Sequence, residues 1–96
     1  DLILTGEIIN QILNKAEDIY DKLDEIRFYN DSIILHIGQN TEIIFSNKDY
    51  KNSLNKLFGF NNQVIKNKGI DIEKIYETIN LTVSKQIITI EKKLEI

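Results

Sequence analysis

The first strong pattern along the chain is helical. Apolar side chains recur every three or four residues from Glu7 to Leu23, the spacing of one buried helix face. That face consists of Ile8, Ile9, Ile12, Leu13, Ala16, Ile19, Tyr20 and Leu23. Thr5 or Gly6 is placed to cap the first turn. The sequence therefore predicts a long N-terminal helix with one face on the core.

The apolar spacing then changes to every second residue, which is typical of strands. Asn30-Asp31 and Gly38-Gln39-Asn40 supply turn residues between three such runs. Short turns join antiparallel neighbours, so we expect a three-stranded meander that ends at Ser46. Its predicted strand residues facing the helices are Ile26, Phe28, Ile33, Leu35, Ile37, Ile43 and Phe45.

A second helix is expected next. Ser46 and Asp49 have the spacing of a capping box, and a helix from about Lys48 to Phe58 would bury one apolar stripe. The stripe contains Tyr50, Leu54, Leu57 and Phe58. Gly59 is predicted to end this helix with a positive φ.

Between Gly59 and the last hairpin the pattern is short and mixed. Residues 62–67 fit a brief further helix closed by Gly69, and residues 71–76 fit one helical turn. Ile79, Leu81 and Val83 then alternate as in a strand.

The chain closes with a predicted β-hairpin. With Ser84-Lys85 as a two-residue loop, Leu81 faces Ile88 and Ile79 faces Ile90 on the core side. The outward side chains would be those of Thr82, Ile87 and Thr89. No later strand follows, so the last strand is expected at the edge of the sheet.

An edge strand offers unpaired backbone groups, and two interpretations are open. The strand from Gln86 to Ile90 is a docking site for a partner strand, or it is an ordinary edge protected by charged neighbours. Those neighbours are Glu91, Lys92 and Lys93, which flank the apolar centre without interrupting it. The candidate partner-binding residues are Thr82, Val83, Gln86, Ile87, Ile88, Thr89 and Ile90.

Composition fits one folded domain over residues 1–96. The chain has 42% hydrophobic and 28% charged residues, so a packed core is expected. The fold class is therefore α+β: a largely antiparallel sheet of about five strands, with a long N-terminal helix and a second central helix packed on it, ending in an exposed edge strand. The first residue is Asp1, not Met, and we expect this domain to be a piece of a longer protein.

The residue types argue against catalysis and against metal or cofactor sites. Cysteine is absent, which excludes disulfides and thiolate ligands, and His36 is the single histidine. The acidic residues between Glu17 and Glu25 lack the glycine-containing loop of an EF-hand. We therefore expect no enzyme activity, no metal and no cofactor.

Charge is unevenly distributed although its sum is only −3. Acids dominate residues 1–25, whereas residues 46–68 contain Lys48, Lys51, Lys56, Lys66 and Lys68. The lysine-rich segment supports a second hypothesis, a small nucleic-acid-binding domain, although the net charge and the absence of an RNA-binding motif weigh against it. A third is a divergent exported lipoprotein or anchor domain whose helix 7–23 packs on another copy.

Several strings, in their order, resemble the C-terminal β domain of the bacterial cell-division family FtsQ/DivIB. Leu4-Thr5-Gly6 is similar to the Leu-Thr/Ser-Gly that opens this region ahead of a long helix. The hairpin from Ser32 to Phe45 is similar to the family's strand, polar turn and second strand. Ile79-Asn80-Leu81-Thr82 lies where the family has Val/Ile-Asp-Leu-Arg before a last strand.

The resemblance implies a non-catalytic scaffold module of the divisome, the septal division machinery. Family members are single-pass membrane proteins in which this domain is extracytoplasmic. The domain binds FtsB and FtsL (DivIC and FtsL in Gram-positive bacteria), and FtsB adds a strand to the last β-strand. A soluble, monomeric fragment of such a membrane-anchored chain is the expectation here, with no nucleic-acid partner.

Three departures from the family pattern concern the partner. Asn80 and Thr82 replace the family's Asp and Arg, and Val83 replaces a frequent aromatic residue. Asn30-Asp31 stands where a basic pair can precede the first hairpin strand. Recognition here is therefore expected to depend on backbone and apolar contacts more than on ion pairs.

Overall fold

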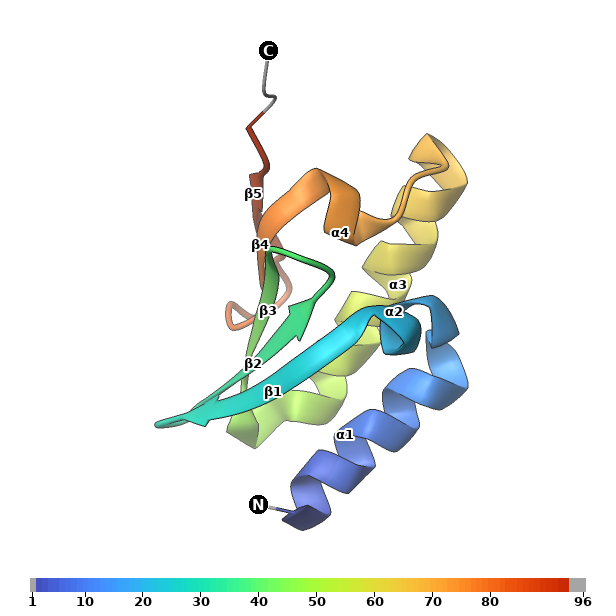
Figure 1. The fold of residues 1–96 in the computed structure, drawn as a ribbon. Helices are drawn as coiled ribbons and strands as arrows, with labels where there is room; N and C mark the ends of the chain where they lie inside the picture. Colours follow the sequence, from blue (N-terminus) through green and yellow to red (C-terminus); the bar gives the residue numbers. More distant parts are fainter. Residues whose placement is uncertain (1, 94–96) are drawn as a thin grey trace.

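The computed structural model describes residues 2–93. The elements in order are α1 (Leu2–Lys15), α2 (Glu17–Lys22), β1 (Leu23–Tyr29), β2 (Ser32–Ile37), β3 (Thr41–Ser46), the 3-10 turn η1 (Asn47–Asp49), α3 (Tyr50–Lys68), α4 (Ile72–Ile75), β4 (Tyr76–Asn80) and β5 (Ile88–Glu91). The strands form one sheet in the order β1-β2-β3-β4-β5, and the helices lie on one side of it (Figure 1). The predicted α+β fold with an N-terminal helix and a central helix is confirmed.

Sheet pairing follows the loop lengths. The short turns make β1–β2 and β2–β3 antiparallel, as expected, and β5 is antiparallel to β4. β3 and β4 are parallel instead, because α3 and α4 carry the chain back across one face between them. The sheet is therefore mixed, although it is mostly antiparallel.

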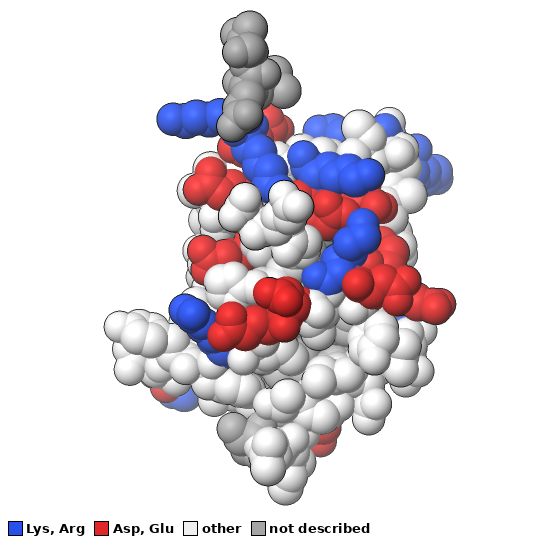
Figure 2. Space-filling model, viewed as in Figure 1, with Lys and Arg blue, Asp and Glu red and all other residues white. Residues whose placement is uncertain are grey.

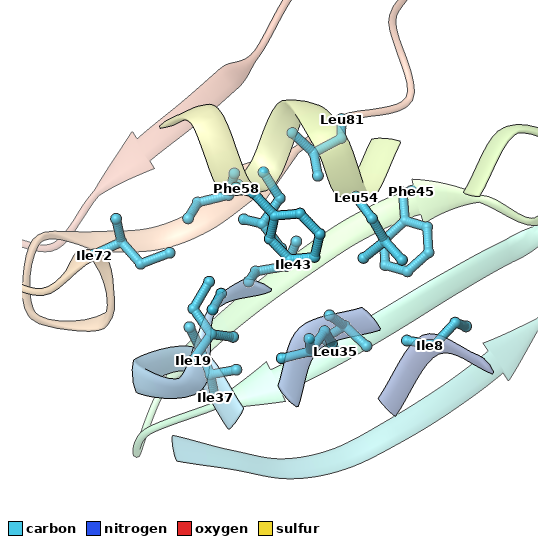
Figure 3. Packing of buried hydrophobic residues seen from close by; sticks show 14 of the residues in the cluster. Ile8, Ile19, Leu35, Ile37, Ile43, Phe45, Leu54, Phe58, Ile72 and Leu81 are labelled. Carbon is cyan, nitrogen blue, oxygen red and sulfur yellow. The ribbon is translucent and has the colours of Figure 1, made fainter. Parts of the chain in front are cut away.

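The core lies between the sheet and the helices (Figure 3). Alternate residues of β2 and β3 point into it, including Leu35 and Ile43, and both are completely buried. Ile8 and Ile12 from α1 and Leu54 from α3 meet them from the helical layer. The alternation confirms the predicted inward faces of β2 and β3.

The N-terminal helix differs from the prediction at its start and in its middle, whereas its predicted end near Leu23 agrees with the end of α2 at Lys22. α1 already includes Leu2, so Thr5 and Gly6 are interior residues and do not cap it. The helix also stops at Ala16, whose φ of −151° and ψ of 67° leave the helical region. The break redirects α2 so that Asp18 accepts a 3.0 Å hydrogen bond from Asn61 of α3. Alanine has the highest helix propensity of all residues, so the local sequence does not predict a break at Ala16. The break is accompanied by this tertiary contact.

The central helix runs straight through the predicted stop. Gly59 is an interior residue of α3 and has no positive φ, so the predicted end at this position is wrong. The reason is that Asn61 and Val64 continue the buried stripe past it. Gly69 does end the helix, with φ of 67° and a 2.8 Å bond from its N–H to the Ile65 carbonyl, as predicted.

The start of the central helix was placed correctly, but its capping contacts differ. Ser46 Oγ accepts the N–H of Lys48 at 3.3 Å rather than that of the third residue. Asp49 accepts a 2.8 Å bond from Asn52 instead of reaching back to Ser46. The reciprocal capping box is therefore not formed, because η1 inserts a tighter turn before α3.

Within residues 2–93, no helix combines the length and the apolar character needed to cross a membrane.

Candidate functional site

The sheet has two edge strands, β1 and β5, and they differ in protection. β1 contains the exposed charged residues Asp24, Glu25 and Arg27, and its pairing is irregular between Leu23 and Glu25. Charges and irregular pairing both discourage the addition of another strand. β5 carries one charged residue within its bounds, Glu91, and pairs only with β4 among the described strands. The β4–β5 pairing is irregular as well, but its extra residue lies in β4, between Tyr76 and Thr78, and not in the edge strand. β5 is therefore the more open edge.

Hydrogen bonds at the end of β5 show which backbone groups point outward. The N–H of Lys92 donates to the Ile75 carbonyl at 2.8 Å, toward the β4 side. Residues of an antiparallel strand alternate in the side to which their N–H and C=O point. Ile88 and Ile90 therefore pair inward with Asn80 and Thr78 of β4.

The alternate residues of β5, Thr89 and Glu91, have the opposite orientation. Their N–H and C=O groups point away from β4. A second bond leads to the same alternation. The N–H of Leu81 donates to the Ile44 carbonyl of β3 at 2.8 Å, so the backbone groups of the preceding residue, Asn80, point the other way, toward Ile88 of β5. A partner strand would therefore bond to Thr89 and Glu91.

The register of the last hairpin is shifted by one residue from the prediction. Asn80 faces Ile88 and Ile79 faces Thr89, where Leu81–Ile88 and Ile79–Ile90 pairs were expected. The expected turn at Ser84-Lys85 is present, since the N–H of Gln86 donates to the Val83 carbonyl at 3.2 Å.

The register is shifted because the chain has one more residue on the β4 side of that turn than on the β5 side. The side-chain oxygen of Asn80 accepts the Thr82 N–H at 2.9 Å, which takes Thr82 out of the ladder. Leu81 pairs with β3 instead and is buried. A shift of one residue exchanges the two faces of a strand. The predicted orientation is therefore wrong: Thr89 lies on the core side, and Ile88 and Ile90 lie on the open side.

The candidate partner-binding residues divide into a loop group and a strand group. Thr82, Val83 and Gln86 lie in the exposed loop between β4 and β5. Ile87 immediately precedes β5 and packs against the core, so the predicted outward position is wrong. In β5 itself, Ile88 and Ile90 are 47% and 55% exposed.

The side chains of Ile88 and Ile90 belong to the sheet face that carries no helix. Cross-strand pairing places Ile88 in one row with Asn80, Ile44 and Ile34, and Ile90 in the next row with Thr78. Figure 1 shows the helical layer on the opposite side. The edge and the open face therefore meet at β5, where a bound strand would extend both rows.

His36 also lies on the open face, at the wall of a pocket of about 760 Å³. The other lining residues are Gln39, Asn40, Glu42, Glu77, Lys92 and Lys93. The His36 Nε2 atom is 3.8 Å from a Glu42 carboxylate oxygen, beyond hydrogen-bond distance, and finds no hydrogen-bond partner among the described residues. In residues 2–93, no group of three or more acidic or histidine side chains is placed to hold a metal ion.

One lysine of segment 46–68, Lys56, is engaged inside the domain, and the other four are exposed. Lys56 bonds to backbone carbonyls of the β4–β5 loop. Lys51 and Lys68 lie 5.9 and 6.0 Å from the ring centres of Tyr50 and Tyr76. On the face drawn in Figure 2, basic and acidic side chains are interleaved. The nucleic-acid hypothesis stays a prediction, and Lys56 is the one lysine of the segment that the structure shows in a competing role.

Comparison of the chain with protein-family models, with curated proteins and with solved structures finds no significant match.

The structure adds to the candidate site two residues that the sequence analysis considered for other reasons. Asn80 shifts the register of the last hairpin, and Lys56 contacts the loop before β5 from a distant helix. Asn80 followed by Thr82 is a local signal, since asparagine side chains often accept a backbone N–H two residues later. No local pattern relates Lys56 to a loop that lies 25 to 30 residues later.

Proposed function

We propose that this domain is a non-catalytic protein-binding module that takes up an extended partner segment as a further strand beside β5. The observation that carries the proposal is the free side of β5, where the backbone groups of Thr89 and Glu91 point away from the sheet. Main-chain hydrogen bonds would supply affinity in this mode, and alternate side chains would supply specificity.

The surroundings of β5 define the kind of segment that fits. Ile88 and Ile90 stand side by side on the open face, so apolar residues at alternate positions of the partner strand would extend their rows. Thr89, on the other side of the strand, is only half-buried. The expected partner is therefore an extended segment with apolar side chains on one face.

Within this proposal, the resemblance to the FtsQ/DivIB family indicates which proteins the partner segment belongs to. It suggests FtsB/FtsL-like (DivIC/FtsL-like) division proteins, and a parent chain anchored by one membrane span with this domain outside the cytoplasm. The support is the order of the family-like strings together with an edge strand at the expected position. The proposed role is scaffolding of the divisome during septal division.

The alternation of backbone groups gives a specific test at Thr89. Proline at this position removes an outward N–H but no bond to β4, and proline is tolerated on edge strands. Thr89→Val is the matched control, because it changes the side chain and keeps the N–H. The probe is the extracytoplasmic segment of the FtsB/DivIC-like protein from the same organism, titrated by calorimetry.

We expect wild type and Thr89→Val to bind alike, and Thr89→Pro to bind about tenfold more weakly or worse. Circular dichroism and thermal unfolding check that the proline variant remains folded. Equal binding by the folded proline and valine variants would exclude strand addition at β5. If the wild-type domain does not bind the probe, an FtsB/DivIC-like protein is excluded as its partner.

A further inference from the structure

β5 is held to the domain by few apolar contacts. It is four residues long, and Ile88 and Ile90 each leave about half of their surface in water. Segments with little buried apolar surface open at a lower free energy than the core does. Polar contacts at the ends of β5 are therefore important for its order.

The contact before β5 is made by Lys56 of α3. Its ammonium nitrogen lies 2.9 Å from the carbonyl oxygen of Val83, 3.0 Å from that of Leu81 and 3.3 Å from that of Gln86. A lysine ammonium has three N–H donors, and here each has one carbonyl acceptor. Hydrogen bonds from a charged donor are stronger than those between neutral groups.

The loop is shaped so that these carbonyls converge. Asn80 draws Thr82 out of the ladder, and the turn at Ser84-Lys85 brings Gln86 back to Val83. Lys85 adopts a φ of 62°, in the left-handed region. Three carbonyl dipoles that point at one place repel one another unless a positive group lies between them. The Lys56 ammonium occupies that position.

We infer that Lys56 is a positioning residue, which holds the β4–β5 loop and thereby fixes the register and the order of β5. The consequence for partner binding rests on the proposed function, whereas the effect on β5 itself does not. The lysine-rich segment thus has a role inside the domain, in presenting the edge strand.

The test compares Lys56→Met with Lys51→Met by hydrogen exchange followed by NMR. Both variants remove one charge from α3, but Lys51 makes no contact with the loop among the described hydrogen bonds. We expect exchange at the Ile88 and Ile90 amides to accelerate about tenfold or more in Lys56→Met alone. Exchange at the Ile43 amide, in the centre of the sheet, should change much less.

A residue that only adds global stability would accelerate all three amides by the same factor, and that result would overturn the inference. Unchanged exchange at Ile88 and Ile90 would also overturn it. Should Lys56→Met not fold, Lys56→Gln keeps a neutral donor at this position and provides the same comparison.

Binding of the FtsB/DivIC-like segment is measured on the same variants. We expect weaker binding by Lys56→Met than by Lys51→Met. When wild type does not bind, the proposed function fails, while the exchange data still decide the role of Lys56.

Discussion

Single side chains join distant parts of the chain at one end of the sheet. The Lys22 ammonium lies 2.6 Å from a carboxylate oxygen of Glu73 and 3.3 Å from one of Asp71. Thr41, which is buried, lies 2.7 Å from the Tyr76 carbonyl oxygen and 3.1 Å from that of Glu73. These contacts fix α4 between the end of α2 and the start of β3.

The Lys22 contacts make stability depend on alkaline pH. The hydrogen bond to Glu73, followed by that to Asp71, raises the pKa of Lys22 above its ordinary value. A raised pKa means that the stabilisation is complete below the unfolded-state pKa of about 10.4 and is lost as pH rises through the folded-state value. Urea unfolding of wild type and Lys22→Met between pH 8 and 11 measures this contribution. We expect the stability difference between the two proteins to shrink toward pH 11, and a constant difference would contradict the assignment.

Tyr50 makes a second contribution to stability that is lost at alkaline pH. Its hydroxyl donates a hydrogen bond to the Glu7 carboxylate, which raises the pKa of Tyr50, and partial burial acts in the same direction. The stabilisation is again present below the unfolded-state pKa of about 10 and lost above the folded one. Absorbance titration of the folded domain should show one tyrosine ionising later in wild type than in Glu7→Gln.

At the scale of elements, the continuous α3 is the clearest departure from the local signals. Gly59 is exposed in the helix interior, and a Cβ built there meets no atom within 4 Å. Alanine at this position should therefore stabilise the domain by about 0.5–1 kcal/mol, since glycine is unfavourable inside helices.

Gly69 is the matched control because its φ is 67°. Gly69→Ala should destabilise the domain by about 1–2 kcal/mol, the cost of a left-handed conformation for a residue with a Cβ. Thermal and urea unfolding of both variants decide the point. A loss of stability in Gly59→Ala would show that the helix ends where the local pattern suggested.

At the scale of the whole molecule, the sheet has one packed face and one open face. Leu35 is fully buried on the packed face, and its neighbour Ile34 lies on the open face, half-buried. Leu35→Ala should cost about 2–5 kcal/mol, through lost burial and a cavity. Ile34→Ala should cost much less, because that side chain has no helical layer above it. Equal losses in urea unfolding would mean that the open face is covered.

The sequence by itself determined the inward faces of β2 and β3 and of the first half of α3. Apolar spacing of two or of three to four residues places β2, β3 and the Leu54 stripe of α3, because burial on one face imposes that period locally. The turn residues and Gly69 were also predicted for a local reason, which is the backbone conformation they adopt. The edge position of β5 was also predicted, and the strand order confirms it.

Only the tertiary structure decided where elements break, which strands pair in parallel and how β5 is registered. The break at Ala16 and the passage of α3 through Gly59 accompany contacts such as the one between Asp18 and Asn61. The register of β5 depends on the Leu81 bond to β3, between residues 37 positions apart along the chain. Local periodicity carries no information about such contacts, because a strand shifted by one residue keeps the same spacing and exposes the opposite face.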